Sequence, residues 1–469
     1  MDKTPKGFFR ESTIVFVFLG LFIFAGLTFS PKDASAVPVF ARKYQTSCTT
    51  CHVGFPKLNA FGEAFKNNGY RLPDDEVFVK EPPVWLGSEA YKRVWPNATW
   101  PGSIPSNVPL SFRIVGEATF DGSRSTVNGQ AKNDFEFPHE VEVNSLGTMG
   151  DNLAFNLGYA IQDESGRGSI ERVFLMYNDA LGGLFNLPQN LVNMRLGLID
   201  PASMPFSIHN QNIFADDGAS IYDFQISSTN QPKVRDSQSG IEFFGTVNKR
   251  FRYAAGVVNG VARDSITDAF TDNNNQKDGY IRTEYKFGGL PFNGAAESSG
   301  SSNGLQPSVT YFDQGNSLTV GSIGYWGSDL IDAASTTDSA YYRVMAFLRA
   351  NHDRYNVDAV YLHQHDDAAA GQFNGTVDDS VNSNGFYVEA TAFLKPWVAL
   401  AARYDNLSIE HVTTLGAANP TDNTSRLSLS MPIYARPNLR IVPEASLGLA
   451  ANRDADTSDN FKLRLDFAY

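Results

Sequence analysis

The last nine residues of the chain read Phe461-Lys462-Leu463-Arg464-Leu465-Asp466-Phe467-Ala468-Tyr469. Every odd position is apolar, and the positions between them carry two bases, one acid and one Ala. Because successive side chains of a β-strand point to opposite faces, this stretch predicts a strand with one apolar and one polar face. A terminal strand that ends on an aromatic residue is typical of chains that close into a membrane β-barrel.

The sequence upstream repeats this pattern. From Pro109 onward, segments of about 10 residues with period-two alternation are separated by polar stretches, as in transmembrane barrels. Helical periodicity is largely missing, and so long a run of evenly spaced strands is unusual for a soluble sandwich. Clear examples are Leu110 to Phe120, Gly240 to Val247, Tyr253 to Val258, Leu318 to Trp326, Tyr341 to Leu348, Val357 to His363, and Gly385 to Phe393.

The connections between these segments alternate in length. In bacterial outer-membrane barrels the short turns face the periplasm and the long loops lie outside. The short connections are predicted at 150–152, 248–250, 351–353, 395–396 and 435–437, and the long ones at 200–237, 260–277, 327–339, 365–384 and 406–423.

The strand count follows from this alternation. About 17 segments qualify, but single-chain bacterial barrels have even counts, which leaves about 16. The weakest candidate, Val309 to Phe312, is short and sits in a Gly/Ser-rich stretch, so we exclude it. We therefore predict a β fold: an up-and-down antiparallel transmembrane barrel over 109–469, wide enough to hold a plug.

The N-terminus predicts export. It combines a basic start, an apolar run shorter than the roughly 20 residues that cross a bilayer, and a small-residue cleavage site. A retained anchor is the alternative, but these features favour a signal peptide over residues 1–36 and a mature chain that begins at Val37. The three parts are Lys3, Lys6 and Arg10, then Ile14 to Leu27, then Ala34-Ser35-Ala36.

Composition excludes several classes of function. The 469 residues carry 38 Lys and Arg against 51 Asp and Glu, a net charge of -13, and so acidic a chain is a poor nucleic-acid binder. Phosphate-cradling loops and the His-Glu-x-x-His metalloprotease motif are absent from the sequence. We therefore assign no catalytic residue and expect no nucleic-acid partner.

Both cysteines of the chain lie in Cys48-Thr49-Thr50-Cys51-His52. This spacing is that of covalent c-type haem attachment, in which Cys48 and Cys51 form the thioether links and His52 binds the haem iron. A disulfide, a thioredoxin-like pair or a zinc site are alternatives. An exported chain with an adjacent His and no further Cys favours haem.

The residues after this motif predict a short helix. Leu58, Phe61 and Phe65 share one face, Pro56 suits the first turn and Gly69 a C-terminal cap. We expect this apolar face to pack on the porphyrin. Residues 37–108 are thus predicted to form a monohaem cytochrome segment, which would plug the barrel.

The second axial ligand of the iron is not evident nearby, because no His or Met occurs between Val53 and Pro138. Either the iron is five-coordinate or the barrel supplies the ligand. The leading candidates are Met204 and His209, followed by His139, Met149 and Met345.

The direction of other polar side chains is predicted from strand parity, that is, from their odd or even positions along each predicted strand. Those expected to face a solvated lumen are Glu140, Glu142, Asn193, Arg195, Arg343 and Arg349. A metal ion could bind at His363-Gln364-His365 with Asp366 and Asp367, although an exposed polar turn is the favoured interpretation.

The haem motif, followed by Phe55-Pro56-Lys57-Leu58-Asn59-Ala60-Phe61-Gly62, Asn68-Gly69-Tyr70 and a porin-like remainder, resembles the fused monohaem cytochrome-porins of bacterial outer membranes. The best-known members are Fe(II) oxidases, whose motif is closer to Leu-Thr-Pro-Phe-Gly-Arg than to the Leu58-Asn59-Ala60-Phe61-Gly62-Glu63 of this chain.

The resemblance implies one haem c in the bacterial outer membrane. An extracellular donor such as Fe(II) would give electrons to a haem near the outer face, and a periplasmic c-type cytochrome would collect them. The alternatives are an outward conduit to extracellular acceptors and a solute porin with a haem-containing plug. Outer-membrane lipid surrounds the barrel in each case.

Overall fold

The computed structural model describes residues 39–44, 46–71, 84–85, 103–104, 109–121, 126–127, 130–131, 133–149, 152–162, 168–215, 218–224, 232–261, 275–294, 309–330, 338–367, 380–411, 423–449 and 459–469. The signal peptide expected over 1–36, the mature start at Val37 and most of 72–108 lie outside the described residues.

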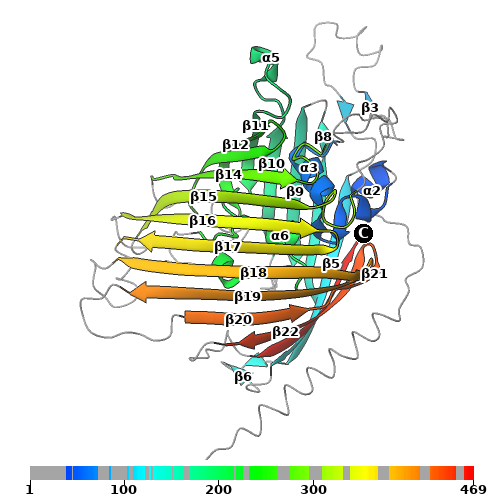
Figure 1. Ribbon diagram of the computed structural model, residues 1–469, viewed down its shortest axis with the longest axis vertical. Coiled ribbons are helices and arrows are strands. Elements are labelled where there is room, and N and C mark those ends of the chain that lie inside the picture. The colour runs from blue at the N-terminus through cyan, green and yellow to red at the C-terminus, as the bar shows by residue number, and fades with distance from the viewer. Residues whose placement is uncertain are drawn as a thin grey trace, which may run out of the picture.

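One closed antiparallel sheet dominates the structure (Figure 1). Its long strands are built from the alternating segments, and each segment singled out in the sequence lies within an observed strand. The strands are β5 (Leu110–Asp121), β8 (Asp134–Met149), β9 (Leu153–Gln162), β10 (Ser169–Tyr177), β11 (Asn193–Ile199), β12 (Gln238–Val247), β13 (Phe251–Val258), β14 (Asp278–Gly288), β15 (Ser317–Leu330), β16 (Asp338–His352), β17 (Tyr355–Asp366), β18 (Val381–Lys395), β19 (Val398–His411), β20 (Asn423–Ser430), β21 (Ile433–Arg436), β22 (Leu439–Gly448) and β23 (Asn460–Ala468).

The C-terminal stretch forms β23 and closes the barrel. It pairs with β5 in a register that sets Phe467 opposite Ile114 and Phe461 opposite Phe120. Strands β20 and β21 both lie between β19 and β22, so they are two parts of one strand, interrupted at Pro432, which has no N–H to donate. The barrel therefore has 16 strands, as predicted.

The excluded segment Val309 to Phe312 is not a barrel strand. In that region the structure has an isolated bridge between Thr310 and Asp313.

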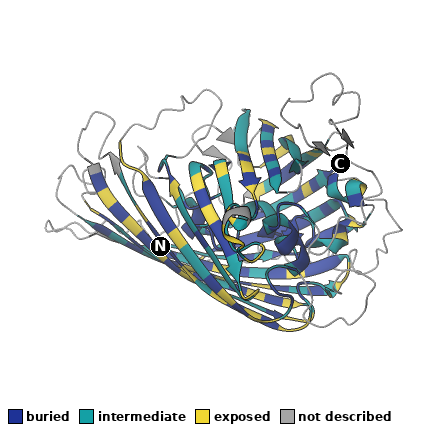
Figure 2. Ribbon diagram, turned by 90° about the horizontal axis from the view of Figure 1, so that it is seen from above, coloured by how far each residue is buried: buried dark blue, intermediate teal, exposed yellow. Residues whose placement is uncertain are grey.

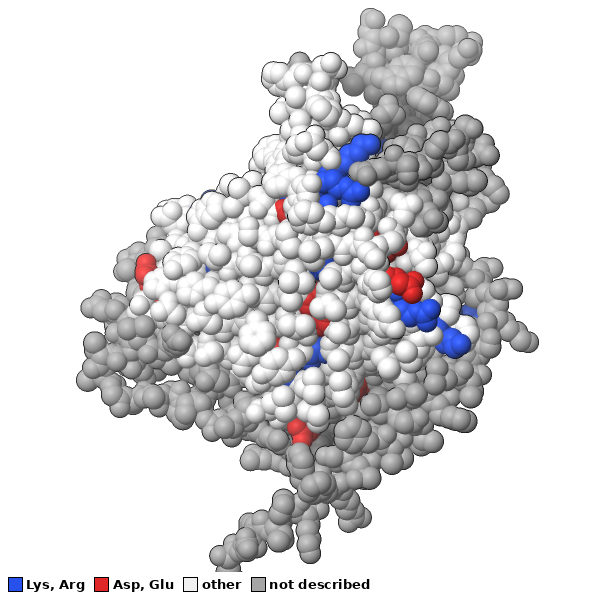
Figure 3. Space-filling model, in the orientation of Figure 1, with Lys and Arg blue, Asp and Glu red and all other residues white. Residues whose placement is uncertain are grey.

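The outer face of the barrel is apolar. On β16, Tyr342 and Val344 are 42% and 49% exposed, whereas Arg343 between them is 1% exposed and points inward. Buried and exposed residues alternate along the strands in Figure 2. The barrel wall seen in Figure 3 carries few charged side chains. Among the described residues, no helix is long and apolar enough to span a bilayer.

The N-terminal segment occupies the lumen at the end of the barrel where the short turns lie (Figure 1). Lys57 is 1% exposed, and its Nζ lies 3.0 Å from Asn356 Oδ1, 3.1 Å from Glu389 Oε1 and 3.5 Å from Asp358 Oδ2. These partners belong to β17 and β18. The elements of the segment are α2 (Val39–Tyr44), the 3-10 turn η1 (Cys48–Thr50), β1 (His52–Gly54), β2 (Lys57–Leu58) and α3 (Ala60–Asn67).

Helix α3 begins later than the sequence indicated. Asn59 is its N-cap, because the Asn59 side chain accepts a hydrogen bond from Gly62 N, while Lys57 and Leu58 pair as β2 with β1. Pro56 therefore precedes the helix and does not lie in its first turn. Gly69, with a φ of 68°, follows the C-cap as predicted.

The connection over 200–237 departs from the expected external loop. It contains α6 (Ile208–Gln211) and α7 (Ser220–Asp223) and packs against the inner wall. Its apolar side chains, among them Met204, Phe206 and Tyr222, form a buried cluster with Phe347 and Tyr387 of β16 and β18. The described part of this connection thus fills lumen that the strands alone would leave open.

The remaining elements are small. Helix α5 (Gly182–Phe185) lies in the connection between β10 and β11. Two short two-stranded sheets pair β3 (Val84–Trp85) with β4 (Ser103–Ile104) and β6 (Thr126–Val127) with β7 (Gln130–Ala131).

Candidate functional site

The Cys48-x-x-Cys51-His52 motif is held against helix α3 by one asparagine. Asn59 N donates to Cys51 O at 2.9 Å, and Asn59 Nδ2 donates to Thr50 O at 3.1 Å. The same side chain caps α3. A Cβ on Gly62 would collide with Cys51 O, so only glycine allows the helix to lie this close to the motif.

A cavity of about 310 Å³ separates this motif from the barrel wall. The two cysteines and His52 border it, together with the α3 residues Phe61 and Phe65. On the plug, therefore, the three residues of the predicted haem site face the same space as the apolar side of the predicted helix. Further plug residues on this cavity are Phe40, Tyr44, Phe55, Leu58, Lys66 and Tyr70.

The two thiols are not joined in a disulfide. Burial raises the pKa of Cys48 to about 11 and that of Cys51 to about 12, with the charge of Cys48 adding to the second shift. Both are therefore neutral thiols at physiological pH.

His52 is prepared to act as a ligand through one nitrogen. Its Nδ1 lies 3.0 Å from the Pro56 carbonyl oxygen, which can only accept, so Nδ1 carries the proton and Nε2 keeps its lone pair. Burial lowers the pKa of His52 to about 4, against the opposing effect of this hydrogen bond. Iron-binding histidines are commonly oriented by such a bond to a backbone carbonyl.

The opposite wall of the cavity belongs to the barrel and is rich in arginine. Arg113 on β5 lies 3.0 Å from Asp466 and 2.6 Å from Glu142, and Arg172 on β10 lies 2.9 Å from Glu171. These ion pairs satisfy most of the buried charge. Arg172 Nε is nevertheless buried without a hydrogen-bond partner. Phe174, Arg195, Asp200 and Ala468 also border the cavity.

Of the five candidates for the second iron ligand, His209 borders the cavity and the other four do not. His209 of α6 borders the cavity, and its Nε2 lies 3.6 Å from Asp200 Oδ1. Burial, assisted by Arg172, lowers the pKa of His209 to about 4, although Asp200 opposes the shift. The imidazole is thus neutral and able to bind a metal.

The other candidates lie elsewhere. Met204 is buried in the apolar cluster of the inserted connection together with Met345. His139 of β8 contacts Glu136, and Met149 ends that strand. None of these four borders the cavity.

A second, smaller cavity of about 150 Å³ lies beside α3. Met204 lines it, together with many charged side chains. Most are already paired: Arg252 and Arg282 contact Glu284, and Lys286 lies 2.7 Å from Asp313 Oδ2. More charged side chains line this space than line the first cavity.

The polar residues assigned to the lumen by strand parity do face inward. Arg343 reaches the Pro232 carbonyl, Arg349 pairs with Asp358, and Arg195 pairs with Glu242 at 2.9 Å. Glu142 and Asn193 are buried, and a Glu140 oxygen lies 3.4 Å from Arg113. The expected solvated lumen is instead packed at these positions by the plug and the inserted connection.

The residues His363, Gln364 and His365 belong to strand β17 and not to a turn. Gln364 is buried, whereas His363 and His365 lie beside Tyr342 and bond to Asn384 and Asn382. No group of metal ligands is found around them within the described residues.

Sequence reasoning missed the roles of Lys57 and Asn59, which anchor the plug and order the motif. The Asn59 role had a signal, since Asn just before an amphipathic run is a strong N-cap residue. The Lys57 role had none, because its partners lie 299 and 332 residues away.

Comparison with known proteins supports the fold alone. No family model and no curated protein matches the chain. A solved structure of OmpTdeltaL8, a loop L8 deletion mutant of the Vibrio cholerae outer membrane protein OmpT, is 14% identical over 77% of this chain and 98% of that one, with a TM-score of 0.50. Salmonella typhi OmpF, solved in complex with daunomycin, is 11% identical over 77% of this chain and 97% of that one, with a TM-score of 0.50.

The chain is therefore a porin-like outer-membrane β-barrel. The closed 16-strand sheet carries its apolar residues outward, as a bilayer requires, and its polar residues inward. The predicted location in the bacterial outer membrane is confirmed.

Proposed function

We propose that this barrel holds one covalent haem c on Cys48 and Cys51 and transfers single electrons across the outer membrane. His52 and His209, which border the same cavity, would be the residues that bind the iron. The donor would be Fe(II) or another extracellular reductant, and a periplasmic c-type cytochrome would accept the electron. When bound, the group supplies one-electron oxidation and reduction at iron.

One observation carries this proposal. Two neutral thiols and a neutral imidazole with a free Nε2 border one cavity inside the barrel, together with the aromatic side chains of the plug. A structural disulfide between Cys48 and Cys51 would not account for the cavity or for the hydrogen-bonded His52 at its edge. A porphyrin needs such a space, two thiols at this spacing and an imidazole next to them.

The chain's own residues have defined tasks in this proposal. Phe61 and Phe65 of α3 exclude water from the cavity, since both are buried. The Pro56 carbonyl fixes the His52 tautomer. Arg172, with an unpartnered Nε, supplies positive charge on the opposite wall, where carboxylate groups of a porphyrin would need a partner.

The location of the cavity changes the expected route. The short turns of such barrels face the periplasm, and the plug lies at that end. In this proposal the haem is at the periplasmic end, near its acceptor, whereas the resemblance implied a haem near the outer face. An extracellular donor would have to deliver its electron through the packed lumen.

The test begins with haem attachment. The full-length protein is expressed in cells that attach haem c and is examined by haem stain after denaturing electrophoresis and by its reduced-minus-oxidised spectrum. It is then inserted into liposomes that contain a periplasmic cytochrome. We expect one haem per chain and reduction of the internal cytochrome on external addition of Fe(II). A chain that attaches no haem would refute the proposal.

Fe(II) is tested apart from the haem. If the attached haem is reduced by ascorbate but not by Fe(II), the substrate assignment is wrong while the conduit stands. A strongly negative midpoint potential would instead favour an outward conduit to extracellular acceptors.

A solute porin with a haem-containing plug is the second candidate. The charged cavity of about 150 Å³ beside α3 favours it, because it is polar space within the lumen. Single-channel conductance separates the two: a large open-state current identifies the porin, and a closed channel agrees with the conduit.

A further inference from the structure

Five basic side chains lie along the barrel rim, at the end where the short turns are (Figure 1). All five are exposed or half-buried, and among the described residues of these turns and of α2 the one acidic side chain is Asp353. Arg42 and Lys395 have no ion-pair partner among the described residues. We call this group the basic arc: Arg42 and Lys43 of α2, Arg354 in the turn between β16 and β17, Lys395 at the end of β18 and Arg436 at the end of β21.

The basic arc is continuous, because each of its turns is bonded to the next around the rim. Arg42 Nη2 donates to the Leu110 carbonyl at the start of β5, and β5 is the neighbour of β23. The other junctions are backbone hydrogen bonds from Phe393 N to Arg354 O at 3.1 Å, from Tyr434 N to Trp397 O at 2.8 Å and from Ala468 N to Asn438 O at 2.9 Å.

The basic arc does not follow from the composition of the chain, which has 51 acidic and 38 basic residues. The long connections at the other end of the barrel have the opposite charge in their sequence. Three of them contain nine acidic residues and neither Lys nor Arg, namely 327–339, 365–384 and 406–423. Charge is therefore divided between the two ends, and the short-turn end carries the local excess of bases.

The basic arc adjoins the larger cavity. Ala41, which precedes Arg42, borders that cavity, as do Phe112 of β5 and Ala468 of β23. These residues lie where α2 meets the rim, and the same cavity is bordered by Cys48. A molecule bound on the basic arc would therefore lie next to the candidate haem site.

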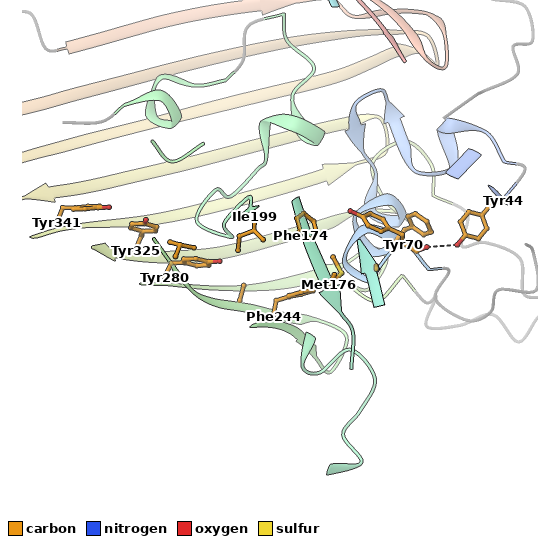
Figure 4. Packing of buried hydrophobic residues seen from close by; sticks show 13 residues of the cluster. Tyr44, Tyr70, Phe174, Met176, Ile199, Phe244, Tyr280, Tyr325 and Tyr341 are labelled. Carbon is orange, nitrogen blue, oxygen red and sulfur yellow. Dashed lines mark hydrogen bonds between the residues drawn. The ribbon is translucent and has the colours of Figure 1, made fainter. Parts of the chain in front are cut away.

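Helix α2 is fixed in this position by Tyr44. The Tyr44 ring meets Phe65 of α3 edge to face, with centroids 5.7 Å apart, and its hydroxyl donates to the Tyr70 carbonyl at 3.0 Å (Figure 4). Lys43 Nζ donates to Thr148 Oγ1 of β8 at 3.3 Å. The two bases of α2 are thus held at the rim by contacts with both the plug and the barrel.

We propose that the basic arc is the docking surface for a small periplasmic electron-transfer protein whose own face is acidic. The role of this partner as electron acceptor rests on the proposed function, whereas its acidic face follows from the charges of the arc. Transient redox complexes bury little surface, so attraction between opposite charges largely decides how often the partners meet. Docking here brings the partner's cofactor beside the larger cavity.

The first test measures association with one probe in two forms: a lysine-rich cytochrome c, and the same protein after succinylation has made its surface acidic. The haem-loaded full-length protein is held in nanodiscs of neutral lipid. We expect only the succinylated form to bind, and its association to slow by about tenfold between low and physiological ionic strength because salt screens the charges. Absence of binding by the succinylated form would refute the docking surface.

Matched charge reversals locate the binding. Lys395→Glu and Lys277→Glu change the net charge equally, but the exposed Lys277 precedes β14 at the long-loop end. We expect association to slow by about threefold in Lys395→Glu and by about tenfold when Arg354→Glu is added. Lys277→Glu should leave it unchanged, and circular dichroism checks that each variant is folded. Equal effects of the two single variants would overturn the assignment to the arc.

The docking surface and the haem can fail separately. A protein that attaches haem but does not bind the acidic cytochrome refutes the surface alone. If the wild type attaches no haem, the proposed function fails, and binding of the acidic cytochrome still decides whether the arc recognises an acidic protein. Capture of phosphatidylglycerol vesicles in place of that cytochrome would identify a lipid contact and overturn the proposal.

The second test maps the contact by chemical cross-linking. A water-soluble carbodiimide joins a lysine amine to a carboxylate as an amide where the two groups touch. In the complex with the succinylated cytochrome, we expect mass spectrometry to find links at Lys43 and Lys395 and none at Lys277. Links at Lys277 alone would place the partner at the long-loop end and refute the proposal.

Discussion

Helix α3 has a cavity on each of two sides, and the two differ in chemistry. The larger holds two thiols, a histidine and aromatic side chains. The smaller is lined by paired charges, including Arg252, Glu284 and Lys286. Lys66 and Arg195 border both. One helix thus separates a space suited to an apolar prosthetic group from a space suited to ions or water.

The position of the two cavities bears on which residue could be the second iron ligand. Met204 and His209 are only five residues apart in the sequence, yet Met204 borders the smaller cavity and His209 borders the larger one. Proximity along the chain therefore did not decide between them. The path of the inserted connection did, because it places Met204 in the apolar cluster on the inner wall and carries His209 on α6 to the larger cavity.

The largest expected effect is the loss of covalent haem when both thiols at the larger cavity are removed. Cys48→Ser combined with Cys51→Ser should abolish covalent haem entirely, since no other thiol exists in the chain. Haem stain after denaturing electrophoresis measures this. Met204→Leu, on the charged cavity, is the matched control and should keep full staining. Covalent haem in the double variant would contradict the assignment of the thiols.

The next largest effect concerns the second axial ligand. His209→Ala should convert a six-coordinate low-spin haem into a high-spin one, because it removes one ligand, and added imidazole should reverse the change. Met204→Ala should leave the spin state unchanged. Electron paramagnetic resonance and optical spectra report both. The reverse outcome would assign the ligand to the other side of α3.

Removal of the plug's anchor should destabilise the folded barrel. Lys57→Met leaves the Glu389 carboxylate buried without its cation, and a broken buried ion pair costs about 3–5 kcal/mol. The measurement is the urea midpoint of unfolding. Lys395→Met, at an exposed position on β18, serves as the control. Equal midpoints for the two variants would show that the ion pair does not hold the plug.

The smallest effect separates the two tasks of Asn59. Asn59→Ala loses the N-cap of α3, which costs about 0.5–2 kcal/mol. Asn59→Asp keeps the acceptor for Gly62 N but loses the Nδ2 donor to Thr50 O. We expect the Asp variant to retain most of the stability, as measured by urea unfolding, while haem attachment falls in both. Identical losses of stability would show that the cap contributes nothing.

The sequence was sufficient for the barrel because the barrel depends on local alternation. The closing strand at Phe461 to Tyr469 and the exclusion of Val309 to Phe312 both followed from period-two patterning and turn spacing. The same reasoning placed Arg195, Arg343 and Arg349 on the inner face. Side-chain direction in a strand is fixed by parity, so no long-range information was needed.

The sequence did not predict how the lumen is filled. The inward fold of 200–237 depends on contacts such as Tyr222 with Tyr387, 165 residues apart, which leave no periodic signal. The start of α3 at Ala60 and not at Pro56 depends on β1 and β2 pairing and on the Asn59 cap. In the candidate site, the motif was readable from the sequence, whereas the cavity, the position of His209 at its edge and the Lys57 anchor arise only from the folded barrel.

The buried Lys57 also imposes an order on biogenesis. Its partners Asn356 and Glu389 are synthesised long after it, and the sheet is complete only when β23 pairs with β5. The N-terminal segment is therefore synthesised before the strands that hold Lys57, and Lys57 can be buried only once β17 and β18 have formed. Until then, the segment that carries Cys48 and Cys51 has no barrel wall around it.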